Sequence, residues 1–134
     1  MNPPTSPAPA AAEISDLVFG WRREKAFLRI RHLAIARGEK IFLHGPSGCG
    51  KSTLLGLIGG VLEPQAGRIA VLGTDIATLG GRARDRVRAA HLGLIFQMFN
   101  LIPWLSVLEN VLLPLQFSPE RRARLEARAR PAKE

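Results

Sequence analysis

The chain has 134 residues, of which 46% are hydrophobic and 22% are charged. This length fits a single domain with a sizeable core, and the composition excludes wholesale disorder. Because Cys49 is the only cysteine, an intramolecular disulfide is excluded and a reducing compartment is indicated. The formal net charge of +8 favours an anionic partner such as a nucleotide, a nucleic acid or an acidic membrane surface, without choosing among them.

The N-terminal segment Met1–Ala12 is rich in proline and alanine, and we predict it to be a disordered leader. It has neither the basic start nor the apolar centre of a secretory signal. The longest uncharged apolar run, Leu54–Leu62, falls well short of the roughly 20 residues that a membrane-spanning helix needs. The globular part of the chain is therefore expected at residues 13–134.

Apolar runs and turn signals predict two strands, then a third strand that leads into a helix. Ile14–Val18 and Phe27–Ile35 are predicted strands on either side of a polar turn at Trp21–Lys25. Lys40–His44 is short, apolar and followed by a glycine-rich loop, which is typical of a buried strand. From Lys51 onward, leucine and isoleucine recur at helical spacing, which predicts a helix that ends at a Gly-Gly pair.

The next elements alternate between strand and helix. Arg68–Leu72 and Leu92–Phe96 are predicted strands, and the arginine-rich stretch Arg82–Ala90 between them is a predicted helix. This alternation predicts an α/β fold, or part of one.

Two helices are predicted to close the chain. Ser106 and Glu109 have the spacing of a capping box, which predicts a helix that starts at Val107 and runs toward Leu115. Ser118 followed by proline is a second start signal, and it predicts a last helix over Pro119–Arg130.

One motif carries strong chemical information. Residues 45–52 match the P-loop pattern G-x-x-x-x-G-K-[ST] without a mismatch, between a predicted strand and a predicted helix as that motif requires. The residues of the loop are Gly45, Pro46, Ser47, Gly48, Cys49, Gly50, Lys51 and Ser52, followed by Thr53.

In such a loop the backbone N–H groups turn toward an anion, and glycine permits positive φ angles and the close approach of a phosphate. The N-terminus of the following helix adds unpaired N–H donors and the positive end of its dipole. Lys51 is then expected to reach the β- and γ-phosphates, and the Ser52 hydroxyl is the expected Mg²⁺ ligand. The motif therefore predicts a P-loop NTPase.

Around this motif the sequence resembles the ATP-binding domain of ABC transporters, over about residues 13–117. Two later strings, Asn100–Pro103 and Ser106–Leu115, are similar to the branch that includes lipoprotein-release and macrolide-export ATPases. The features that carry the wider resemblance are, in chain order, Gly38-Glu39, Gly45–Gly60, Pro64, Gly67, Arg68-Ile69 and Leu92–Gln97.

The resemblance implies a P-loop NTPase core with an antiparallel β subdomain and a helical subdomain that begins near residue 98. It implies that Gly45–Thr53 hold ATP, and that Gln97 contacts Mg²⁺ and the attacking water and relays the nucleotide state to a membrane partner. It also implies that Trp21 stacks on adenine, where the family often has tyrosine, with Phe19 as the rival. Trp104 would lie in the region that faces the membrane partner, as an interface anchor or as a packed residue.

The family also requires a signature motif of the L-S-G-G-Q type, an apolar strand that ends in Asp-Glu, and a switch histidine. None of these occurs in the 134 residues, so the sequence resembles the N-terminal part of a cassette, cut within the helical subdomain. Without the glutamate and the opposing signature, little stabilisation of the transition state remains. We therefore expect this chain alone to bind ATP with Mg²⁺ and to hydrolyse it negligibly.

Three interpretations of function stay open. The first is an ATP-binding subunit, of the export or lipoprotein-release type, that energises a membrane permease through a contact region at about Gln97–Ser106 and pairs with a second ATPase domain or with itself. The second is a non-catalytic nucleotide-binding regulator. The third, part of a soluble ABC ATPase that acts on nucleic acid, is not favoured, because Arg82–Arg88 and Arg121–Arg130 lack interleaved aromatic residues. The resemblance implies a cytoplasmic position at the inner face of the cytoplasmic membrane.

Overall fold

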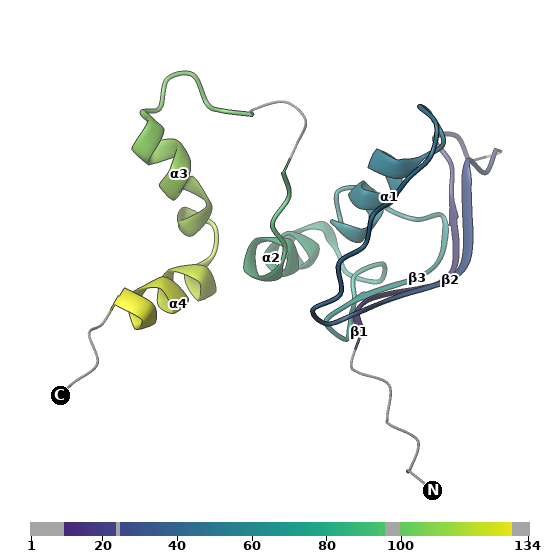
Figure 1. Cartoon of the computed structure of the whole chain (residues 1–134), viewed down its shortest axis with the longest axis horizontal. Coiled ribbons are helices and arrows are strands. Elements are labelled where there is room, and N and C mark those ends of the chain that lie inside the picture. The colour runs from purple at the N-terminus through teal and green to yellow at the C-terminus, as the bar shows by residue number, and fades with distance from the viewer. Residues whose placement is uncertain (1–9, 24, 96–99, 130–134) are drawn as a thin grey trace, which may run out of the picture. The chain divides into compact units, whose positions relative to one another are not determined.

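The computed structural model describes residues 10–23, 25–95 and 100–129 (Figure 1). The chain divides into two compact units, with the division between Gly80 and Gly81. The first unit contains the strands and one helix, and the second contains helices joined by irregular segments.

An antiparallel sheet forms the first unit. Within the described residues it has four strands in the order β2-β1-β3-β4. β1 is hydrogen-bonded to β2 along one edge and to β3 along the other, so it is internal to the sheet. The strands are β1 (Ala10–Phe19), β2 (Leu28–Ala36), β3 (Ala66–Val71) and β4 (Thr74–Asp75).

A bulge in β1 keeps its apolar side chains on one face. Asp16 has a φ of 48°, and the register with β3 shifts between Ser15 and Val18. An extra residue in one strand shifts the alternation of side chains by one position. The apolar positions after the bulge therefore lie on the same face of the sheet as those before it. These buried positions are Ala12 and Ile14 before it, and Leu17 and Phe19 after it.

The core of the first unit lies where helix α1 (Lys51–Ile58) packs against β3. Leu57 of α1 and Ile69 of β3 have no exposed surface. At the end of the helix the N–H of Gly59 donates to the carbonyl oxygen of Leu55 at 2.8 Å and the N–H of Gly60 to that of Leu57 at 3.0 Å, which confirms the predicted end at the glycine pair. This packing fixes the position of the helix whose first residues belong to the P-loop.

The second unit contains α2 (Gly81–His91), α3 (Val107–Gln116) and α4 (Pro119–Ala129), and α4 contacts both of the others. The guanidinium groups of Arg121 and Arg124 donate to the carbonyl oxygens of Leu92 and Ala90, at the end of α2. The last carbonyls of a helix lack partners within it and carry partial negative charge, so these two arginines stabilise the end of α2.

Most of the predicted elements are confirmed, with bounds that differ by a few residues. β1 begins at Ala10, so the alanines of the predicted leader at positions 10–12 belong to a strand, and Ala12 is buried. These residues pair with both β2 and β3, which overrides the weak strand preference of alanine.

The two strands predicted at Lys40–His44 and Leu92–Phe96 are wrong for the residues that the structure describes. Residues 39–46 and 92–95 are irregular, and Phe42 is 87% exposed. A strand forms only beside another strand, and within the described part of the chain neither segment has one. Phe96 itself lies outside the described residues.

Gly67 offers a test of the bulge. Its φ is 92°, and a Cβ there would lie 2.4 Å from the carbonyl oxygen of Asp16, whereas Gly73, with a φ of 84°, has open space around it. We expect Gly73→Ala to lower the free energy of unfolding by about 1–2 kcal/mol, the cost of the left-handed backbone. We expect Gly67→Ala to cost roughly 1–3 kcal/mol more, because the backbone of β1 must move.

Urea unfolding followed by circular dichroism measures both variants against the unsubstituted chain. Equal losses for Gly67→Ala and Gly73→Ala would contradict the close contact between Gly67 and the bulge.

Candidate nucleotide-binding site

The P-loop joins the irregular segment after β2 to the start of α1. Gly48 and Gly50 have φ angles of 79° and 86°, in the region that glycine enters without strain. A Cβ on Gly50 would lie 3.0 Å from the ring of Phe27, and one on Gly45 would lie 2.7 Å from Sγ of Cys49. Gly48 is therefore favoured by its backbone conformation, Gly45 by the nearby Cys49 side chain, and Gly50 by both conformation and a close neighbour.

The N-terminus of α1 is open to an anion. No side chain caps it, and its first turn contains no acidic residue. The N–H groups of the first turn and the positive end of the helix dipole are therefore left without a carboxylate that would compensate them. Ser52 is exposed at the second position of the helix, while Thr53 is buried, so Ser52 presents the accessible hydroxyl.

The side chain of Lys51 folds back over the loop. Its Nζ donates to the carbonyl oxygens of Gly45 at 3.0 Å and Pro46 at 3.2 Å. A phosphate oxygen carries negative charge that a carbonyl oxygen lacks, so phosphate oxygens can compete for this ammonium group. These features together fit a nucleoside triphosphate with Mg²⁺, with the N–H groups and Lys51 on the phosphates and Ser52 on the cation.

An aromatic hollow lies beside the loop. Phe27 lines this hollow, and its ring is also the nearest neighbour of Gly50. Its volume is about 320 Å³. Trp21 is 65% exposed there, and its ring meets that of Phe19 edge to face at 5.1 Å between centroids. Phe19 is buried in the core, so of the two stacking candidates only Trp21 has a ring face available. The hollow is lined by Trp21, Arg22, Lys25, Ala26 and Phe27.

The turn that carries Trp21 is held by Gln65. Its Nε2 donates to the carbonyl oxygens of Gly20 and Arg22, both at 3.1 Å, and its backbone N–H donates to Val18. Neither Gln65 nor Phe27 was predicted from the sequence as a residue of the site. Phe27 has one available signal, since it is an aromatic residue at the end of the same turn as Trp21, whereas Gln65 is distant in sequence and has none.

Gln97, the predicted ligand of Mg²⁺ and water, lies outside the described residues. Among the residues that are described, no cluster of three histidine, cysteine or acidic side chains could hold a metal ion. In that part of the chain, no helix combines the length and the apolar character needed to cross a bilayer.

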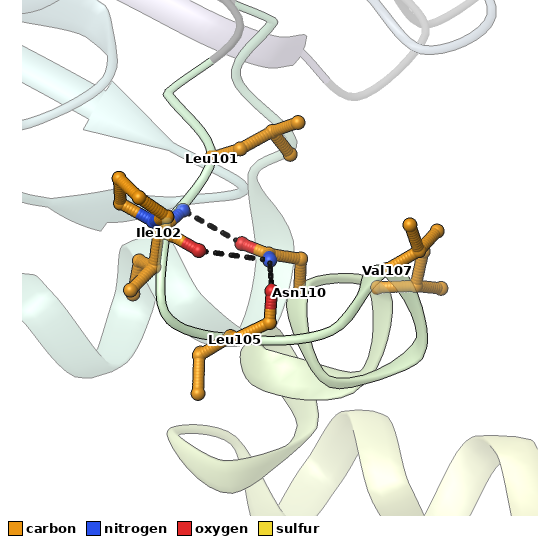
Figure 2. A pocket seen from close by; sticks show the side chains of 7 residues that line it. Leu101, Ile102, Leu105, Val107 and Asn110 are labelled. Carbon is orange, nitrogen blue, oxygen red and sulfur yellow. Dashed lines mark hydrogen bonds between the residues drawn. The ribbon is translucent and has the colours of Figure 1, made fainter.

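The loop before α3 is organised by one side chain, that of Asn110 (Figure 2). Its Oδ1 accepts from the N–H of Ile102 at 2.8 Å. Its Nδ2 lies 3.2 Å from the carbonyl oxygen of Ile102, 3.1 Å from that of Leu105 and 3.0 Å from that of Ser106. The loop therefore has a defined shape that depends on a residue of the helix.

The same loop presents an apolar surface. Trp104 is 84% exposed, so within the described structure it is not a packed residue. Next to it is a hollow of about 260 Å³, whose lining residues are Leu101, Ile102, Pro103, Leu105, Val107, Asn110 and Val111 (Figure 2). We call the exposed residues Leu101, Trp104, Val107 and Val111 the α3 apolar surface.

Comparison with known families agrees with the loop geometry. The family model described as "ABC transporter" matches residues 28–133, which is most of the chain. The chain belongs to the ABC transporter family. The match includes the P-loop, α1 and all of the helices of the second unit.

Curated ABC proteins are similar to this chain over most of its length. An uncharacterized ABC transporter ATP-binding protein of Mycobacterium tuberculosis is 45% identical over 97 residues, which are 72% of this chain and 29% of that protein. The lipoprotein-releasing system ATP-binding protein LolD of Cereibacter sphaeroides is 44% identical over 107 residues, which are 80% of this chain and 48% of that protein.

A solved ABC cassette has the same fold. The dimeric structure of a post-hydrolysis state of the cassette MJ0796, bound to ADP and Pi, matches with a TM-score of 0.72 and 32% identity. The match covers 92% of this chain and 50% of that one. The chain therefore spans about half, or less, of the length of the ABC proteins that it matches.

The capping box of α3 offers a test by pH. Oε2 of Glu109 accepts from the hydroxyl and from the backbone N–H of Ser106, each at 2.7 Å, and these two bonds lower the pKa of Glu109 below 4.5. Because the folded pKa is lowered, the box stabilises α3 above pH 4.5 and loses this contribution as the pH falls through the folded value. We expect Ser106→Ala to raise the Glu109 pKa toward 4.5.

Titration of the side-chain carboxyl carbon by NMR measures this pKa. Ser118→Ala, which changes the start of α4 instead, is the matched control and should leave the Glu109 pKa in place. A Glu109 midpoint at or above 4.5 in the unsubstituted chain would show that the capping box does not form in solution.

Proposed function

We propose that this chain is the ATP-binding part of an ABC transporter, and that it binds ATP with Mg²⁺ at the P-loop to energise a membrane permease. The observation that carries the proposal is the uncapped N-terminus of α1, with Lys51 folded over a glycine-rich loop, in a chain of this family. ADP and Pi are bound by the related cassette MJ0796, which supports the choice of nucleotide.

In this proposal, different residues of the site bind different parts of the nucleotide. The N–H groups of the loop and Lys51 hold the phosphates, and the hydroxyl of Ser52 binds Mg²⁺ together with Gln97. The ring of Trp21 stacks on the adenine, with Phe27 at the side of the same hollow. Mg²⁺ would neutralise charge on the phosphates, which are the groups at which hydrolysis takes place.

Binding is the part of the reaction that this chain can perform. The sequence has no acidic pair at the end of an apolar strand and no L-S-G-G-Q motif, so the 134 residues contain neither the glutamate that would polarise the attacking water nor the signature that would complete the site of an opposing subunit. We therefore propose negligible hydrolysis by the chain alone. Hydrolysis in the complete transporter would require a dimer, as in the cassette MJ0796.

We propose further that the permease binds at about Gln97–Ser106, through the α3 apolar surface. Trp104 and its neighbours expose a contiguous apolar loop and helix end, which is the type of surface that partner proteins cover. The similarity to the LolD protein supports an exporter of the lipoprotein-release type. Such a role places the chain at the inner face of the cytoplasmic membrane.

The structure supports a structural use of the arginine-rich stretches rather than a nucleic-acid surface. Arg121 and Arg124 donate to the end of α2, Arg84 is buried, and Arg88 pairs with Asp85 at 2.6 Å. These contacts leave fewer guanidinium groups available for phosphates of a nucleic acid.

A fluorescent ATP analogue with Mg²⁺ tests nucleotide binding. We expect saturable binding to the monodisperse chain, and we expect Lys51→Ala to weaken it at least about tenfold because a charged phosphate contact is lost. Lys40→Ala, which removes an exposed lysine outside the loop, is the control and should bind as the unsubstituted chain does. In the same titration Trp21→Ala should weaken binding by about tenfold, since stacking on one base contributes roughly 1–3 kcal/mol.

Equal binding by the Lys51→Ala and Lys40→Ala variants would exclude the P-loop as the nucleotide site. Steady release of phosphate by the unsubstituted chain, lost in Lys51→Ala, would contradict the proposed lack of hydrolysis.

Site-specific crosslinking tests the permease contact. A photoreactive amino acid at position 104 should crosslink to an integral membrane protein in membranes of the native host, because Trp104 lies on the α3 apolar surface. The same group in place of Leu125, which is exposed on α4, is the control and should not crosslink to that protein. Equal crosslinking from both positions would contradict a specific contact at Trp104.

A further inference from the structure

A single glutamine side chain holds the backbone on both sides of Trp21. The neighbouring residues, Gly20 and Arg22, have carbonyl oxygens that both accept from Nε2 of Gln65, each at 3.1 Å. A side-chain amide nitrogen carries two N–H groups, so it can donate one to each carbonyl. Both donors of one planar group are therefore used to fix the segment that carries the exposed tryptophan ring.

Gln65 is itself fixed to the sheet. It stands directly before β3, and its backbone N–H donates to the carbonyl oxygen of Val18 in β1 at 2.8 Å. The next residue, Ala66, pairs with Val18 in the register between β1 and β3. The amide therefore extends from a position that is hydrogen-bonded to the internal strand, and it connects that strand to the turn of Trp21.

The turn of Trp21 is closed by its main chain, but the ring stands out from it. The N–H of Phe27 donates to the carbonyl oxygen of Phe19 at 2.7 Å, and a Cβ on Gly20 would lie 2.1 Å from the carbonyl oxygen of Lys25. Trp21 is 65% exposed and meets the buried ring of Phe19 by an edge. A ring that is ordered only on binding costs conformational entropy at that moment, so a fixed turn favours stacking.

We infer that Gln65 is a positioning residue for the base of the nucleotide, which acts by holding Trp21 in the orientation that stacks on the base. The inference rests on the proposed function, since it takes a nucleotide at the P-loop as given. Without the side-chain amide, the turn moves before binding, and the base must then order it. The affinity for ATP therefore depends on Gln65, whereas the affinity of the P-loop for phosphates alone does not.

Isothermal titration calorimetry with ATP and with inorganic tripolyphosphate, each with Mg²⁺, tests this role. We expect Gln65→Ala to weaken ATP binding about threefold to tenfold, the scale of one or two neutral hydrogen bonds, and to leave tripolyphosphate binding unchanged. Gln65→Met, which keeps the length of the side chain but has no N–H to donate, should lose the same affinity for ATP. Because Gln65 is exposed, neither substitution opens a cavity in the core.

Two further variants separate positioning from a general effect on the fold. Gln116→Ala, the same substitution at an exposed glutamine of α3, is the control and should bind both ligands as the unsubstituted chain does. In a Trp21→Ala background, Gln65→Ala should weaken ATP binding no further, because the ring through which it acts is already absent.

The ring of Trp21 can also be observed without a ligand. The chain has two tryptophans, so a Trp104→Phe background leaves Trp21 as the only one. We expect Gln65→Ala and Gln65→Met to lower the fluorescence anisotropy of Trp21 in this background, because its turn gains motion on the nanosecond timescale. This measurement needs no nucleotide, so it reports on the positioning contact even if the proposed function is wrong.

Several results would overturn the inference. One is an unchanged affinity for ATP in both Gln65 variants, or an equal loss for ATP and tripolyphosphate. Others are a further loss when Gln65→Ala is added to Trp21→Ala, and an unchanged anisotropy of Trp21. Tripolyphosphate bound as tightly as ATP would leave the P-loop as the site and overturn the inference alone. Failure of the unsubstituted chain to bind either ligand would overturn the proposed function, and this inference with it.

Discussion

The first unit depends on the main-chain pairing of β1 with β2 and β3. Each part of the candidate nucleotide site extends from this pairing: the turn of Trp21 continues β1, the P-loop follows β2, and β3 supports α1. The bulge at Asp16 allows β1 to keep its apolar residues in the core along its whole length, because it corrects the alternation midway. A change in this pairing would therefore displace the phosphate loop and the aromatic hollow together.

Signals contained within a few residues predicted the structure well. The P-loop pattern, the capping box of Ser106 and Glu109, and the Gly-Gly end of α1 all depend on neighbours in sequence. Elements that depend on distant partners were not predictable in this way. The segment 40–44 has the composition of a strand but no strand beside it, and Ala10–Ala12 are recruited into β1 by pairing on both sides. Local sequence encodes a preference, and hydrogen-bonding partners decide whether it is realised.

The same distinction explains which site residues were found. Lys51 and Ser52 are defined by a spacing, so a pattern identifies them. Gln65 acts from 45 residues away on the carbonyl of Gly20, and only the folded chain brings the two together. Its amide connects the loop before β3 to the turn of Trp21, so the aromatic hollow is tied to the sheet independently of the P-loop. The proposed nucleotide site would thus have two supports, α1 for the phosphates and Gln65 for the base.

The side chain of Asn110 has an entropic consequence for recognition. Because one amide group fixes both ends of the loop from Ile102 to Ser106, the backbone of that loop has little conformational freedom left to lose when a partner arrives. A partner that binds this loop would therefore meet a surface that is already ordered, and binding would cost less conformational entropy. The conformation of the loop would then be set when the chain folds, before a partner binds.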